Sequence, residues 1–331
     1  MQVSDLAARQ QSAFDFLFAN QNQDGGWSYK AKGLSYTEPT AMAILALLSP
    51  VGAGRADNKV RTDLVQVVKA GLDWLRMGWH EDGGWGIFHE DSFSNWNTYL
   101  GAWVWGVILK TPLLVSRFAQ PEDENRLKHT RDFILVNMRE PLVGADQGKQ
   151  IKNLFSINYN FQGFSWGPHE AGWVIPTSLA LIALTVFDQT ASTTNPIVQN
   201  ARSYLSDRSC PVGGWNVGNP FMFDKQLPPT PDATAYALLA WSATGTAADF
   251  YRADTTNAAV AKLTVFLTAS KSDLTIALTT WALRLWQDDP NQFDTLAKQQ
   301  SKLGGWGESS FVTAFGALAL SSSRYYFKPG S

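Results

Sequence analysis

The sequence predicts an all-α protein, an (α/α)6 barrel or toroid of six helical hairpins. Six segments share one frame, in which a threonine is followed by an Ala/Leu-rich helical run. The six threonines are Thr40, Thr98, Thr177, Thr234, Thr275 and Thr313. A Gly-Gly-Trp loop precedes four of these segments, and a second helical pattern lies upstream of every one. Internal repetition of this kind indicates a repeat architecture before any other signal is considered.

The first unit gives the pattern in full. Ala13, Phe16 and Leu17 fall on one helical face ahead of Gly25 and Trp27. Loops of the same kind stand at 83–85, 213–215 and 304–306, a variant stands at 163–166, and the fifth unit has no such loop. Each unit therefore reads as helix, glycine-rich turn, helix.

The two helices of each unit differ in their content of charged residues. The upstream helices carry charged residues, such as Glu122, Asp123 and Glu124, whereas the threonine-bearing helices are nearly uncharged. A helix that is apolar all round is buried, and one with a polar stripe faces solvent. We therefore expect two concentric rings in a single domain, residues 1–331, with the threonine-bearing helices inside.

The third unit carries an insertion at about 139–162. Long loops in a compact domain are usually functional or disordered, and the aromatic residues Phe155, Tyr159 and Phe161 argue against disorder. We expect this segment to be a lid over one mouth of the barrel that contributes at least one aromatic contact.

Composition excludes several classes of function. The net charge of −2 lacks the basic excess that is typical of proteins that bind nucleic acid. The single cysteine excludes an internal disulfide or a thiolate-rich metal site. The first residues lack the apolar core of a signal peptide, and the longest apolar run, 101–109, is shorter than the roughly 20 residues that span a bilayer. We expect a cytoplasmic protein without a transmembrane segment, a cofactor or a metal. His80 and His89 are possible metal ligands with acidic neighbours, but they lack the spacing of ligands on a helix.

One complete motif resembles a known family. It consists of Ala13, Phe16, Leu17, Gln21, Gly25 and Trp27. The motif resembles the QW repeat of squalene–hopene and oxidosqualene cyclases, with partial matches in units two, four and six. The resemblance implies the α/α barrel and, because only one barrel is present, a single-domain type of class II terpene cyclase. Protein prenyltransferase β-subunits and complement thioester domains share this barrel, but their zinc ligands and thioester motif have no match here.

A second segment bears on the chemistry. Residues 223–235, FDKQLPPTPDATA, resemble the cyclase segment with the Asp-x-Asp-Asp-Thr-Ala motif, whose middle aspartate is a general acid. That aspartate falls on Asp232, while the two flanking aspartates fall on Thr230 and Ala233. The resemblance implies that Asp232 is the catalytic acid. The alternative is a structural carboxylate in the first turn of a helix, where the helix dipole favours it.

If the units are equivalent, the residues two before each threonine form a ring at one mouth of the barrel. They are Glu38, Trp96, Ile175, Asp232, Asp273 and Phe311. Apolar surroundings desolvate a carboxyl and raise its pKa, so we expect Asp232 to be protonated at neutral pH. His169, in the loop before the third inner helix, is expected to hydrogen-bond Asp232, and Glu170 could take its place. A solvated loop histidine is the alternative.

Aromatic residues expected on the inner helices are candidates for substrate binding. They are Trp96, Trp103, Trp173, Tyr236, Trp281, Phe311 and Phe315. In a dry cavity each ring face can stabilise a migrating positive charge by roughly 2 kcal/mol. The alternative is that these rings fill the core.

The most consistent function is proton-initiated cyclisation of a linear isoprenoid or meroterpenoid chain. No Asp-Asp-x-x-Asp cluster is present to hold a magnesium diphosphate. The alternatives are a non-catalytic barrel that binds isoprenoids or lipids and, more remotely, a carbohydrate-active α/α barrel with paired carboxylates across a polar cleft. A dry aromatic cavity would favour a cyclase, and an open polar cavity would favour a carbohydrate-active enzyme.

Overall fold

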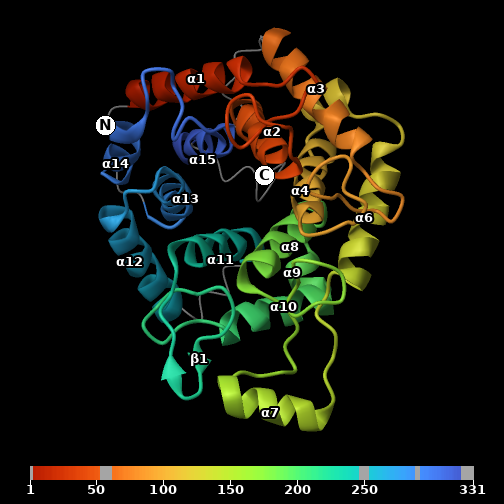
Figure 1. Cartoon of the computed structure of the whole chain (residues 1–331), viewed down its shortest axis with the longest axis vertical. Coiled ribbons are helices and arrows are strands. Elements are labelled where there is room, and N and C mark those ends of the chain that lie inside the picture. The colour runs from red at the N-terminus through yellow and green to blue at the C-terminus, as the bar shows by residue number, and fades with distance from the viewer. Residues whose placement is uncertain (1–2, 53–61, 246–252, 288–290, 322–331) are drawn as a thin grey trace.

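The structure is a computed structural model that describes residues 3–52, 62–245, 253–287 and 291–321. Its helices form two rings around one axis (Figure 1). The inner ring consists of α2 (Thr37–Gly52), α4 (Asn97–Leu109), α8 (Val174–Phe187), α11 (Pro231–Thr244), α13 (Asp273–Arg284) and α15 (Ser310–Leu320). The outer ring consists of α1 (Val3–Ala19), α3 (Thr62–Met77), α6 (Asp123–Asn137), α10 (Pro196–Asp207), α12 (Ala253–Ala269) and α14 (Gln292–Gln299).

The inner ring is closed. Each inner helix packs against the next in the order α2, α4, α8, α11, α13 and α15, and α15 packs against α2. Five of the six repeat threonines are buried inside this ring. The predicted fold class and the predicted division into inner and outer helices are confirmed.

The recurring threonine is explained by its contact with the loop ahead of it. In unit one the backbone N–H of Trp27 donates to Oγ1 of Thr40 at 2.9 Å, and the indole Nε1 donates to the carbonyl of Leu17 at 2.9 Å. The same pair of bonds recurs around Trp85, Trp215 and Trp306. The tryptophan thus ties each of these four loops to both helices of its hairpin, through its backbone N–H and through its indole N–H, which is why the tryptophan and the threonine recur.

In units one and six a glutamine ahead of the tryptophan loop joins the hairpin to the next one. The amide of Gln21 donates to the carbonyls of Gly25 and Val67, at 2.8 Å each, and so links α1 to α3. Gln300 makes the equivalent bonds to Gly304 and to Arg9 on α1, which closes unit six onto unit one.

Three further helices of the described residues lie outside the two rings: α5 (Pro112–Phe118), α7 (Ala145–Phe155) and α9 (Ala191–Thr194). A small hairpin pairs β1 (Phe221–Met222) with β2 (Lys225–Gln226). No single helix among the described residues is long and apolar enough to cross a membrane; α4 and α5 together pass that test by length and composition, with a bend of 106° between them.

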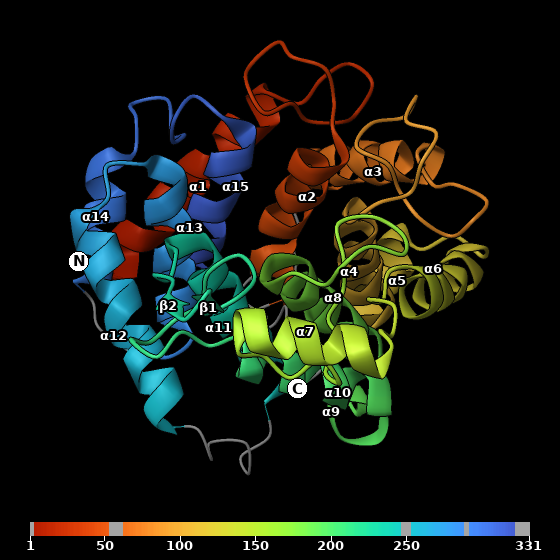
Figure 2. The same cartoon turned by 60° about the horizontal axis from the view of Figure 1, so that its bottom comes forward.

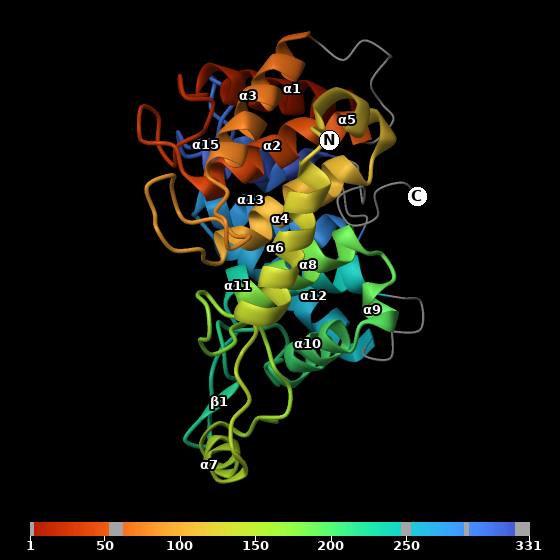
Figure 3. The same ribbon diagram turned by 90° about the vertical axis from the view of Figure 1, so that its right-hand side faces the viewer.

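The insertion does not take the predicted position. Helix α7 lies beside β1 (Figure 2) and projects away from the barrel (Figure 3), and no residue of 139–162 lines the central cavity. Its stem follows the outer helix α10: the N–H of Asn158 donates to Asp207 at 2.9 Å, and the N–H of Gln162 donates to Asn200 at 2.7 Å. The expected lid is therefore not observed, because the polar stem is anchored to the outer ring.

Candidate active site

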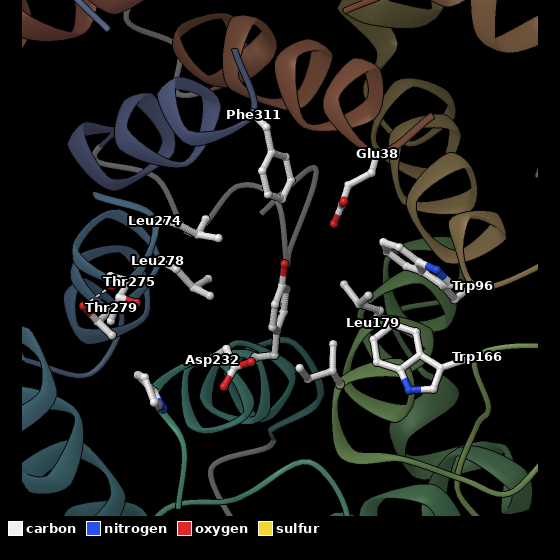
Figure 4. Close-up of a pocket in the computed structure, with 13 residues that line it drawn as sticks. Glu38, Trp96, Trp166, Leu179, Asp232, Leu274, Thr275, Leu278, Thr279 and Phe311 are labelled. Atoms are coloured by element: carbon white, nitrogen blue, oxygen red, sulfur yellow. Dashed lines mark hydrogen bonds between the residues drawn. The ribbon is translucent and has the colours of Figure 1, made fainter. Parts of the chain in front are cut away.

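A cavity of about 480 Å³ opens at the N-terminal ends of the inner helices (Figure 4). Nine of its thirteen lining residues are apolar or aromatic, and the other four are two carboxylic acids and two threonines. The lining consists of Glu38, Trp96, Trp166, Ile175, Leu179, Pro231, Asp232, Tyr236, Leu274, Thr275, Leu278, Thr279 and Phe311. None of these described lining residues is basic, so they offer no charged partner to a diphosphate or carboxylate group.

Glu38 is the acid that the cavity desolvates. It lies in the first turn of α2 and projects toward the cavity (Figure 4). Burial raises the pKa of Glu38 to about 7, although a hydrogen bond from the hydroxyl of Tyr29 works in the opposite direction. Burial is also the main reason that the pKa of Tyr29 is raised, with the charge of Glu38 adding to it, so Tyr29 is a neutral donor. A carboxyl with this pKa is substantially protonated at neutral pH.

Aromatic rings hold the Tyr29–Glu38 pair in place. The ring of Tyr29 lies 5.1 Å from that of Tyr36 and 5.4 Å from that of Phe311, centroid to centroid. Tyr236, on the far side of the barrel, has its pKa raised by burial first and then by the charge of Glu38. The carboxyl of Glu38 therefore sits in the apolar, aromatic environment that was expected around Asp232.

Asp232 lies on the side of the cavity opposite Glu38 (Figure 4). It is exposed, and its Oδ1 accepts a hydrogen bond from the hydroxyl of Thr230 at 2.5 Å. The predicted desolvation of Asp232 is wrong, because its position at the rim leaves it in contact with solvent. Its contact with Thr230 also fits a carboxylate in the first turn of a helix.

His169 does not reach Asp232 in the described structure. It is exposed, has a backbone φ of 63°, and its N–H donates to the carbonyl of Asn137 at 2.9 Å. Glu170 accepts from the N–H of Gly167 at 3.1 Å. Neither residue lines the cavity, so the predicted partnership of His169 with Asp232 is not present in this structure.

The seven predicted aromatic residues divide into three groups. Trp96, Tyr236 and Phe311 line the cavity. Trp103, Trp281 and Phe315 are fully buried beneath it. Trp173, just before α8, is 38% exposed and does not line the cavity.

Trp166 is a lining residue that sequence reasoning missed. In the variant loop of unit three, Phe164 takes the structural role, and its N–H donates to Thr177 at 2.8 Å. Trp166 can therefore face the cavity, where its ring meets that of Trp96 edge to face at 5.3 Å. The signal was present, because Trp166 follows Phe164 by two residues, as Tyr29 follows Trp27, and the other three loops have no aromatic residue at that position.

Unit five departs from the predicted ring. Helix α13 presents Leu274, Thr275, Leu278 and Thr279 to the cavity, whereas Asp273 is not part of the lining. This unit has no tryptophan loop to bind the threonine, and α13 is instead capped by Ser272, whose hydroxyl accepts from the N–H of Thr275 at 3.3 Å. The residues that α13 presents to the cavity are therefore shifted within the repeat frame relative to those of the other inner helices.

The double ring of helices places the chain among the α/α toroids, whose solved members include enzymes of different chemistry. The type II terpene cyclase MstE from Scytonema has a TM-score of 0.60 at 14% identity, covering 97% of this chain and 98% of that chain. An α-1,6-mannanase from a Salegentibacter species has a TM-score of 0.59 at 9% identity, covering 96% and 98%. These likenesses establish the fold.

The sequence comparisons add one relative. No family model matches the chain. Enfumafungin synthase from Hormonema carpetanum is 24% identical over 238 residues, which are 68% of this chain and 16% of that protein. The chain thus matches a small part of a much longer relative.

Proposed function

We propose that this protein is a class II terpene cyclase that protonates an alkene of a linear isoprenoid or meroterpenoid chain, with Glu38 as the general acid. The observation that carries the proposal is a carboxyl with a pKa of about 7 in an apolar cavity rimmed by aromatic rings. A general acid is most effective when its pKa lies near the working pH.

The contacts of Glu38 suit both halves of a proton transfer. Tyr29 occupies Oε2, so Oε1 is the oxygen that would carry the proton toward the substrate. The electron pair of the alkene takes that proton, the O–H bond breaks, and a tertiary carbocation forms. The hydrogen bond from Tyr29 then stabilises the carboxylate left behind, and it does so more strongly than it stabilised the neutral acid.

The rest of the cavity would guide ring closure. Each remaining alkene attacks the cation ahead of it, forming a carbon–carbon bond and moving the charge along the chain. Ring faces of Trp96, Trp166, Tyr236 and Phe311 can stabilise this charge without reacting with it. The last cation loses a proton or is captured by a nucleophile on the substrate, so the reaction is an isomerisation overall.

The head group of the substrate would remain at the mouth. The absence of a basic residue from the described lining favours an uncharged tail inside the cavity, with any polar group at the rim near Asp232. MstE has been captured with geranylgeranyl dihydroxybenzoate as its substrate, which is an isoprenoid chain on an aromatic head. We propose a substrate of this general class for the present chain. The cytoplasmic location stays a prediction.

Two substitutions test the proposal directly. Glu38→Gln removes the proton and keeps the shape, so it should abolish the formation of cyclic product from linear isoprenoids. Asp232→Asn is the matched control and should retain measurable cyclisation, because Asp232 is exposed. Loss of activity in Asp232→Asn with retention in Glu38→Gln would return the acid role to Asp232.

A glycosidase is the second candidate, because Glu38 and Asp232 face one another across the cavity and the mannanase shares the fold. Paired carboxylates are what glycoside hydrolysis needs. The apolar lining argues against it, since few side chains could bind sugar hydroxyls. Release of reducing sugar from α-1,6-mannan by the purified protein would overturn the cyclase proposal.

A further inference from the structure

We infer that the cavity accepts a folded isoprenoid of farnesyl size and that the stacked pair Trp103–Trp281, in the layer beneath the residues that line the cavity, closes the barrel there and sets this limit. The inference rests on the proposed function and specifies its substrate. A volume of about 480 Å³ holds about 16 non-hydrogen atoms if each takes about 30 Å³, the volume of a water molecule in the liquid. A farnesyl chain fills that space, and one further isoprene unit exceeds it.

This buried layer, which we call the floor, consists of rings from three inner helices that lie beneath the lining residues and do not themselves line the cavity. Trp103 of α4 and Trp281 of α13 are stacked, with ring centroids 5.9 Å apart and planes inclined by 8°. Both side chains are almost fully buried, with exposed fractions of 1% and 2%. Phe315 of α15, with no exposed surface, packs against Trp281 at 5.9 Å and beneath the lining residue Phe311 at 5.0 Å.

The floor crosses the axis of the barrel. Helices α4 and α13 belong to units two and five, which stand opposite each other in a ring of six (Figure 1). Two tryptophans that meet from opposite walls leave no passage between them. The residue of α13 that meets Trp103 is Trp281.

This geometry has a measurable consequence for binding. A chain gains affinity with each carbon that it buries, so affinity should rise with length until the cavity is full. Beyond that length an added isoprene unit stays at the solvent-exposed mouth and gains little. Replacing one ring of the floor by a smaller side chain would open space below and let a longer chain bury more of itself.

The test measures binding without turnover. In the Glu38→Gln protein, which lacks the proposed proton, geraniol, farnesol and geranylgeraniol are titrated and followed by tryptophan fluorescence. Farnesol should bind at least about tenfold more tightly than geraniol, and geranylgeraniol no more tightly than farnesol. Adding Trp281→Leu or Trp103→Leu should make geranylgeraniol bind at least about tenfold more tightly than farnesol.

Trp105→Leu is the matched control. Trp105 is on the same helix as Trp103 and is also buried, but its ring packs under the guanidinium of Arg76 on the outer ring, 4.7 Å away. It should leave the order of the three alcohols unchanged. If a leucine variant does not fold, Trp281→Phe, a smaller change, carries the same comparison.

Two results would overturn the inference. One is geranylgeraniol binding tenfold more tightly than farnesol with the floor intact, and the other is folded floor variants that keep the original order. If the unsubstituted protein forms no cyclic product while the length order holds, the proposed function fails and the binding limit stands. Failure of all three alcohols to bind would contradict both.

Discussion

The hydroxyl of Tyr29 donates a hydrogen bond to Oε2 of Glu38, which ties the first tryptophan loop to the acid on the first inner helix. This bond stabilises the carboxylate and opposes the effect of burial on the pKa of Glu38. The readiness of Glu38 to release a proton is therefore set by two opposing influences, one from the loop and one from the cavity.

Tyr29→Phe should raise the pKa of Glu38 further, because the bond that lowers it is removed while burial remains. The alkaline limb of the pH–rate profile of cyclisation should move to higher pH. The maximal rate should fall about tenfold to a hundredfold, since a hydrogen bond to the carboxylate formed on proton transfer is lost. A profile that keeps its alkaline limb in place would argue that another group supplies the proton.

Glu38 should also make stability depend on pH. Its pKa is raised on folding from 4.5 to about 7, so its contribution is fully favourable below pH 4.5 and is lost as the pH rises through 7. After allowing for solvent around the half-buried carboxyl, the loss is about 1 kcal/mol, which for a chain of 331 residues is about 1–2 °C in melting temperature. Thermal scans of the parent and Glu38→Gln proteins at pH 5 and pH 8 measure it; equal pH dependence in the two proteins would count against a desolvated Glu38.

Thr40→Val should destabilise the fold by about 1–3 kcal/mol, because it leaves the buried N–H of Trp27 without an acceptor. Thr275→Val is the control. It removes the equivalent hydroxyl in the unit that has no tryptophan loop, so it should change stability by less than about 0.5 kcal/mol. Urea denaturation of the two variants measures the difference, and similar losses in both would contradict the role assigned to the loop.

Gly304→Ala should be among the most damaging single changes in the chain. The residue has a φ of 91°, and an added Cβ would lie 2.1 Å from the carbonyl oxygen of Ser12 on α1. The expected cost is about 3 kcal/mol or more from backbone strain and overlap. Gly144→Ala is the comparison, since a Cβ there meets no atom within 4 Å. A Gly304→Ala protein with an unchanged denaturation midpoint would refute the close approach of units six and one at this loop.

The repeat predicted the architecture because one physical contact recurs. The bond between Thr40 and the loop at Trp27 has copies in units two, four and six, and Phe164 makes it in unit three. A pattern that encodes a hydrogen bond can be recognised without coordinates. The insertion at 139–162 has no counterpart in the other units, and nothing in its own composition said which surface would hold it.

The acid could not be chosen from the sequence for a related reason. The repeat places Glu38, Asp232 and Asp273 at equivalent positions, and a motif resemblance favoured Asp232. What distinguishes them is burial, which depends on neighbours from other units: Tyr29 and Phe311 cover Glu38, whereas Asp232 remains exposed. Trp166 likewise depends on a substitution inside its loop, and its orientation follows only once Phe164 is seen to take the structural place.

The bonds of Gln300 to both Gly304 and Arg9 have a consequence for how the molecule comes apart. An open array of repeats has two end units that can fray one after another. Here the last hairpin is hydrogen-bonded to the first, so the closed ring has no end unit at which unfolding could begin. Unfolding any one hairpin must break its contacts with both neighbouring hairpins at once. We therefore expect the cavity to keep its shape until the whole ring unfolds.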